Sequence, residues 1–204
     1  IKLIWTDITL RKKIFFVLFC LVIFRALAAI PIPGIDELAL SRFLSNNQFF
    51  GILNIFSGGG LSNLSIIMLG VGPYITGSII MQLLTMMVPA LKRLYHEEGE
   101  AGRRKFSQWS RMLTVPLAAV QGFSLLFILE QQNILIPLSA FDRITNLFIV
   151  VAGAVLLMWV GELVTEFGIG NGVSLIIFAG IVSRLPSTVS QLAFAFDVSQ
   201  VPLY

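Results

Sequence analysis

Long blocks of apolar residues separated by short polar segments run along most of this chain. Blocks of about 18 such residues are long enough to cross membrane hydrocarbon as helices, and these blocks lack the regular polar positions of a soluble amphipathic helix. The pattern therefore predicts an all-α, polytopic membrane helix bundle, with residues 1–204 forming a single membrane domain. The five predicted spans are Ile14 to Ile30, Leu64 to Leu91, Met112 to Leu129, Ile144 to Gly161 and Val173 to about Leu192.

The stretch between Arg42 and Lys92 breaks this pattern, because it holds no charge yet is too long for one span and lacks a polar loop for two. Phe49 to Phe56 would form a helix of only about 12 Å, and the glycines at 58–60 then end it. Irregular backbone at membrane depth persists only where protein buries it or where it lines a wet cavity. We therefore predict a short re-entrant element at residues 49–63 on the outer side. The alternative is a surface amphipathic turn followed by a kinked span.

The second block, Leu64 to Leu91, is unusually long. As one continuous helix it would measure about 42 Å, which exceeds the roughly 30 Å hydrocarbon core. We expect it to tilt, to kink near Gly70 to Pro73, or to protrude into the cytoplasm.

Basic residues gather on one side of the predicted bundle. Lys2 and Arg11 to Lys13 precede the first block. Six more follow the second block: Lys92, Arg93, Arg103, Arg104, Lys105 and Arg111. The positive-inside bias therefore predicts a cytoplasmic N-terminus. Arg25, near the outer end of the first block, is expected to reach the headgroups. No small-residue cleavage site follows that block, so we expect it to be a retained span rather than a signal peptide.

Composition narrows the chemistry. The chain is 56% hydrophobic and 12% charged, against roughly a quarter charged in soluble domains. Cys20 and His96 are the single residues of their types, which excludes an intrachain disulfide and leaves no thiol or histidine set for zinc. No span carries a histidine that could activate Ser65, Ser78 or Ser124 as a nucleophile, so we expect neither an enzyme nor a cofactor or metal site.

Six sequence strings, in order and at matching spacing, resemble the SecY family. They are IPIPGID (30–36), NIFSGGGLSNLSI (54–66), GPYITGSIIMQLL (72–84), EEGEAGRRKFSQW (97–109), MWVGE (158–162) and GIGNGVSLIIFAGIV (168–182). This resemblance implies a protein-conducting channel shaped as a pseudo-symmetric clamshell of two five-span halves, with this chain as the first half. It also implies that the re-entrant element is a plug helix.

The resemblance carries three sets of channel residues onto this sequence. The pore ring of branched aliphatics falls on Val71, Ile75, Ile177 and Ile181. The plug falls on Ile52, Leu53, Asn54, Ile55, Phe56, Ser57, Gly58, Gly59, Gly60 and Leu61. The lateral gate, through which signal sequences leave into lipid, falls on Thr76, Ile79, Ile80, Gln82 and Gln121. By spacing alone, the Val and Ile pairs also fit ordinary helix packing, and the two glutamines fit structural hydrogen bonds.

The resemblance also implies partners. The contact surface for the SecA motor or the ribosome falls on Arg103, Arg104, Lys105, Gly170 and Asn171, although Asn171 also fits a helix cap. Phe167 departs from the family, in which an arginine is expected at this position. Further implied partners are the SecE and SecG subunits, signal sequences, unfolded polypeptide, membrane lipid and a C-terminal half of SecY. The implied location is the bacterial plasma membrane, with the thylakoid membrane as an alternative.

The main rival interpretation is half of a secondary transporter, because broken helices at the midplane are typical of that class. Transporters place ionisable groups along the substrate path. Between Leu64 and Gly161 the predicted spans hold none apart from positions at their ends, such as Glu130 and Glu162. The sequence therefore favours a channel.

Overall fold

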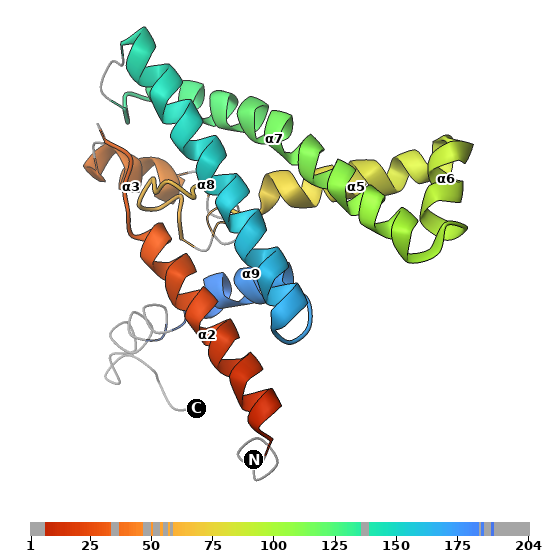
Figure 1. Cartoon of the computed structure of the whole chain (residues 1–204). Coiled ribbons are helices and arrows are strands. Elements are labelled where there is room, and N and C mark those ends of the chain that lie inside the picture. The colour runs from red at the N-terminus through yellow and green to blue at the C-terminus, as the bar shows by residue number, and fades with distance from the viewer. Residues whose placement is uncertain are drawn as a thin grey trace, which may run out of the picture.

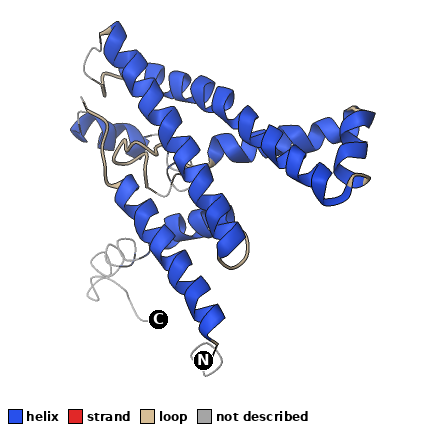
Figure 2. Ribbon diagram, viewed as in Figure 1, coloured by secondary structure: helices blue, strands red, loops and turns tan. Residues whose placement is uncertain are grey.

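A computed structural model describes residues 7–33, 37–46, 50, 54, 57, 59–135, 139–183, 185 and 189. Its named elements are all helices, as Figures 1 and 2 show. They are α2 (Ile8–Ala28), α3 (Glu37–Asn46), α5 (Gly72–Met87), α6 (Pro89–His96), α7 (Gly99–Gln131), α8 (Ala140–Phe167) and α9 (Gly172–Val182). The predicted all-α class is confirmed.

Two of these helices, α7 and α8, are each long and apolar enough to cross a membrane, and α5 with α6 makes a third if the bent pair counts as one span. The helix α2 has 21 residues but includes the charges of Arg11 to Lys13 in its first turns. Of the fifth predicted span, the helix α9 (Gly172–Val182, 11 residues) covers residues 173–182. The count of five spans stays a prediction.

The second predicted span, Leu64 to Leu91, is not one helix. Residues 64–71 form consecutive turns, and α5 begins only at Gly72. A second bend of 111° separates α5 from α6. Pro73 and Pro89 each stand in the first turn of a helix, where the missing N–H costs nothing and the fixed φ angle favours a start. The expected kink near Gly70 to Pro73 is therefore a complete break.

The helices α7 and α8 form an antiparallel hairpin whose closed end lies at the upper left of Figure 1. The helix α5 packs along α7, and α6 packs on the first turns of α7. We call α6 and residues 99–110 of α7 the arm; it extends away from α8 in Figure 1. Residues 92–111, which join two predicted spans, are thus mostly helical, because between α6 and α7 only residues 97 and 98 lie outside a helix.

Small side chains let α7 approach its neighbours closely. Its buried residues recur at every fourth position: Gly102, Phe106, Ser110, Thr114, Ala118, Gly122 and Leu126. Each residue of this series lies next to the following one on the helix surface, as in the small-residue interfaces of membrane helices. A Cβ added at Gly77 of α5 would lie 3.3 Å from the Ser110 carbonyl oxygen. The α5–α7 contact is therefore nearly backbone to backbone.

Two apolar clusters hold the remaining elements together. One joins the turns at 61–68 to the end of α7 and the first half of α8, and includes Leu129 and Val150. The other joins α2, α8 and α9, and includes Phe24 and Leu157. Cys20 is buried in this second cluster.

Candidate functional site

The described part of the predicted plug is a hydrogen-bonded turn rather than a loose glycine loop. Asn54 and Ser57 are both buried, at 5% and 2% exposed. The Asn54 side-chain oxygen accepts the Ser62 N–H at 2.9 Å, and its carbonyl oxygen accepts the Gly59 N–H at 2.9 Å. The Ser57 hydroxyl oxygen accepts the Leu61 N–H at 3.1 Å. Ile52, Leu53, Ile55, Phe56 and Gly58 lie outside the described residues.

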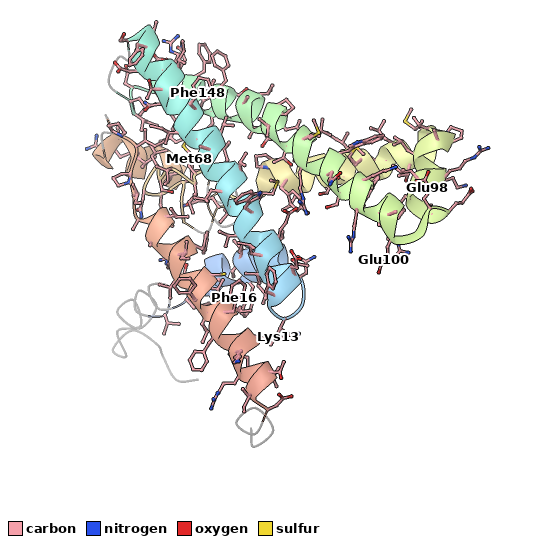
Figure 3. The ribbon with its side chains drawn as sticks, viewed as in Figure 1. Lys13, Phe16, Met68, Glu98, Glu100 and Phe148 are labelled. Carbon is pink, nitrogen blue, oxygen red and sulfur yellow. The ribbon has the colours of Figure 1, made fainter. Side chains whose placement is uncertain are left out.

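The turns that follow are tied to the end of the first helix. The Ile32 N–H donates to the Leu64 carbonyl at 2.9 Å, and the Ile66 N–H donates to the Ile30 carbonyl at 3.0 Å. These bonds flank an isolated antiparallel bridge between Pro31 and Ser65. Figure 3 labels Met68 within this irregular segment, beside α8. The segment is thus buried in protein, which is the condition for irregular backbone at membrane depth.

Three of the four predicted ring residues pack in one place. Val71 is 1% exposed within the α2–α8–α9 cluster, and Ile75 and Ile177 pack against it. Ile75 and Ile177 also line a cavity of about 590 Å³ between α5, α7, α8 and α9. Ile181, one turn further along α9, is 43% exposed and outside the cluster. Their service as a ring stays a prediction.

The predicted gate residues divide between two cavities. Thr76 and Gln121 line an apolar cavity of about 470 Å³ that α5, α7 and the turn at 61–69 enclose. Ile79 and Gln82 instead line the larger cavity of about 590 Å³. Ile80 is half-buried. Gln82 lies exposed in the last turns of α5, whereas Gln121 is half-buried in α7.

The predicted partner residues lie at one end of the hairpin. Arg103, Arg104 and Lys105 are exposed in the arm, and Arg103 and Arg104 share a cavity of about 570 Å³ with Glu166 of α8. Figure 3 places Glu98 and Glu100 at the far tip of the arm, so this surface carries both signs of charge. Asn171 caps α9, because its side-chain oxygen accepts the Ser174 N–H at 3.1 Å. Gly170 beside it has a φ of +73°, which a residue with a side chain rarely adopts.

Two ion pairs between α7 and α8 were missed from the sequence. Arg111 pairs with Glu162, and Arg143 pairs with Glu130. In the sequence these residues are isolated charges at the ends of predicted spans. Their equal spacing on the two helices could have indicated that they pair. Within the described residues, no group of three or more His, Cys, Asp or Glu side chains is placed to hold a metal.

Comparisons with known proteins place this geometry in a family. A sequence model of the SecY family matches residues 65–203. A protein translocase subunit SecY from Corynebacterium glutamicum is 45% identical over 194 residues, which cover 89% of this chain and 44% of that protein. One from Rickettsia typhi is 45% identical over 198 residues, covering 94% of this chain and 45% of the relative. The chain belongs to the SecY family. It spans less than half the length of these relatives.

Solved structures agree with SecY membership at the level of the fold. The chain superposes on a protein conducting channel with a TM-score of 0.62 at 22% identity, covering 87% of this chain and 37% of the other. Sec61 in the canine ribosome-channel complex from the endoplasmic reticulum gives a TM-score of 0.61 with the same identity and coverage. At this identity the likeness concerns the fold alone.

Phe167, the departure from the expected SecY pattern, has a packing contact. Its ring meets Phe16 of α2 edge to face, with centroids 6.1 Å apart and planes at 74°. Such aromatic pairs stabilise a contact by about 0.5–1.5 kcal/mol beyond area burial. The position therefore joins α8 to α2.

Proposed function

We propose that this chain is the N-terminal part of the central subunit of a protein-conducting channel, which moves unfolded secretory proteins across a membrane and membrane proteins into it. The observation that carries the proposal is the identity of 45% with proteins named translocase subunit SecY, over 89% of this chain. The N-terminus is proposed to lie in the cytoplasm of a bacterium. SecE, SecG, a second half of the same protein, and SecA or the ribosome are the proposed partners.

The proposed waist of the channel is apolar. Water leaves a narrow apolar constriction easily, so a ring of aliphatic side chains blocks ions without holding a passing polypeptide. Val71, Ile75 and Ile177 support this role because they gather where α5 and α9 approach α8. Ile181 would join them by contact with residues of the second half.

The proposed plug and gate lie next to each other. Leu61, from the end of the plug, and Thr76 and Gln121, from the gate, line the same apolar cavity of about 470 Å³. A hydrophobic signal helix entering beside Gln121 would therefore meet the wall that the plug supports. This adjacency favours an opening in which gate and plug respond together.

The transporter alternative loses support from the ion pairs. Glu130 and Glu162 were the acids nearest to a possible transport path, and each is held by an arginine on the neighbouring helix. Neither acid is therefore an unpaired charge on such a path.

A complementation experiment tests the proposed function. Residues 1–204 replace the corresponding part of SecY in a bacterium whose own SecY can be depleted. We expect the hybrid to restore growth and export of a periplasmic reporter. The proposal is contradicted if the hybrid reaches the membrane at a normal level yet exports neither SecA-dependent nor ribosome-dependent substrates.

A further inference from the structure

The two α7–α8 ion pairs stand in matching register. Nineteen residue steps separate Arg111 from Glu130 on α7, and nineteen separate Arg143 from Glu162 on α8. The residues between them, 112–129 and 144–161, contain no Asp, Glu, Lys or Arg. Nineteen helical steps rise about 28 Å, close to the roughly 30 Å hydrocarbon core of a bilayer.

The two pairs also resemble each other in burial. The arginine side chains are 43% and 42% exposed, and the carboxylate side chains are 18% and 21% exposed. Each acid is thus largely removed from water while its arginine still reaches it. Charges are costly at the bilayer centre, so two charge pairs at the ends of uncharged segments favour positions at the two interfaces.

Helix electrostatics do not account for the Glu130–Arg143 pair, which we call the outer pair. Glu130 lies in the last turn of α7 and Arg143 in the first turn of α8. The helix dipole disfavours an acid at a C-terminus and a cation at an N-terminus. Each group is therefore unfavourable on its own helix, and its compensation is the bond of 2.7 Å between Arg143 Nη2 and Glu130 Oε1 across the hairpin.

The Arg111–Glu162 pair, which we call the inner pair, does not coincide with a helix end. Arg111 lies twelve residues after the start of α7, so that helix continues through the arm beyond the pair. Neither helix length nor the start of α7 therefore indicates where the membrane surface crosses this end of the hairpin.

We propose that Arg111–Glu162 and Glu130–Arg143 mark the two membrane surfaces and lock the α7–α8 hairpin at a fixed depth in the bilayer. In this arrangement residues 112–129 and 144–161 are the parts of the two helices within hydrocarbon. The arm is the part of α7 that stands outside it.

Spin labels in the complete SecY protein, reconstituted in vesicles with Cys20→Ala, test this assignment. Phe141 and Phe148 flank Arg143 and are 76% and 71% exposed, which makes both suitable labelling positions. Figure 3 shows Phe148 on the outer surface of α8. Oxygen is enriched in hydrocarbon, whereas a water-soluble nickel complex stays outside it. We therefore expect the label at 148 to collide mainly with oxygen and the label at 141 to collide mainly with the nickel complex. Labels at Val115 and Gln108, on either side of Arg111, should divide in the same way.

Charge reversal then tests the lock itself. Glu130→Arg or Arg143→Glu places like charges together, and we expect the label at 148 to shift toward water. The double swap E130R/R143E should restore its depth, and Arg143→Lys should leave it unchanged. If a single reversal prevents accumulation of the protein, the double swap must recover the protein level.

Three outcomes overturn the proposal. The first is a label at 148 or 115 that is exposed to water while both ion pairs are intact. The second is an unchanged label depth in both single reversals, and the third is a double swap that restores neither the label depth nor the protein level. Lys105→Glu is the matched control, because it reverses an exposed charge in the arm beyond the inner pair. It should change no label depth.

Discussion

At the residue scale, several glycines stand where the neighbouring backbone leaves no room for a side chain. A Cβ added at Gly153 of α8 would lie 2.0 Å from the Ile66 carbonyl oxygen, and one at Gly172 would lie 2.0 Å from the Gly161 carbonyl oxygen. Neither neighbour is a flexible side chain, so the backbone itself would have to move. These two glycines therefore set how closely α8 approaches the turns at 64–71 and the start of α9.

Gly153→Ala should destabilise the protein by about 1–3 kcal/mol, the usual cost of overpacking. Thermal melting of the purified complete protein in detergent measures the change. Gly72→Ala is the control, because nothing lies within 4 Å of a Cβ at Gly72. Equal melting temperatures for the two variants would contradict the close approach at Gly153.

The two gate glutamines should differ in effect. Gln121 lines the apolar cavity beside Thr76, whereas Gln82 lines the larger, more polar one. Gln121→Leu removes a polar group from the wall a signal helix would contact, so less hydrophobic signals should be exported. Gln82→Leu should change this threshold less. Export of a reporter series with graded signal hydrophobicity measures both, with Gln131→Leu at the exposed end of α7 as control. A larger effect at Gln82 would reverse the assignment.

At the element scale, the plug segment combines anchored and glycine-rich backbone. Its turn is held through the side chains of Asn54 and Ser57, and the following residues pair with Ile30 and Ile32. The bonds of Asn54 and Ser57 are internal to residues 54–62, so they hold the shape of the turn. The pairing of residues 64 and 66 with Ile32 and Ile30 fixes the backbone that follows the predicted plug. This arrangement suits an element that moves as one ordered unit about a fixed end.

Deleting Asn54 to Leu61 should raise the resting ion conductance of the complete channel. The deletion removes both the anchoring side chains and Leu61, which is buried in the first apolar cluster. Conductance of planar bilayers containing the purified channel measures it. Asn54→Leu, which removes only the side-chain oxygen, should leak less than the deletion. Resting conductance equal to that of the intact channel would argue against a seal, unless neighbouring residues replace the plug.

The sequence predicted some elements well and others poorly, for identifiable reasons. Apolar block length predicted α7 and α8, and the uncharged, glycine-rich stretch predicted the break before α5. The arm was missed because its charges suggest a loop, although Gly102, Phe106 and Ser110 continue the spacing by four that buries α7. The ion pairs were missed because a contact between helices depends on their relative placement, which one-dimensional spacing does not determine.

At the scale of the whole molecule, the described helices leave large apolar surfaces. Met86 and Met87 at the end of α5 are 81% and 78% exposed, and Phe148 on α8 is 71% exposed. Lipid covers such surfaces in a membrane protein, and so does the remainder of a longer chain. The length of the SecY relatives, of which this chain spans 44% in one case, is consistent with both.

Phe167→Arg should separate packing from partner binding. The change removes the edge-to-face contact with Phe16 and adds a cation beside the exposed Gly170 and Asn171. We expect tighter binding of ribosomes, whose RNA is anionic, together with a lower melting temperature. Sedimentation of ribosomes with vesicles measures the first. Phe167→Leu should lower the melting temperature without a gain in binding, and a gain with leucine would contradict the electrostatic explanation.

The long first part of α7 gives the molecule an external handle. Because α6 and α5 both pack on α7, a load applied near Glu98 is carried along stiff helices to the cavity beside Ile75 and Gln82. The Arg111–Glu162 pair lies where α7 leaves α8, which is the point about which the arm would pivot under such a load. Under the proposed function, force on the arm would tilt α5 from outside the proposed passage, and the passage would be prepared before a polypeptide enters it.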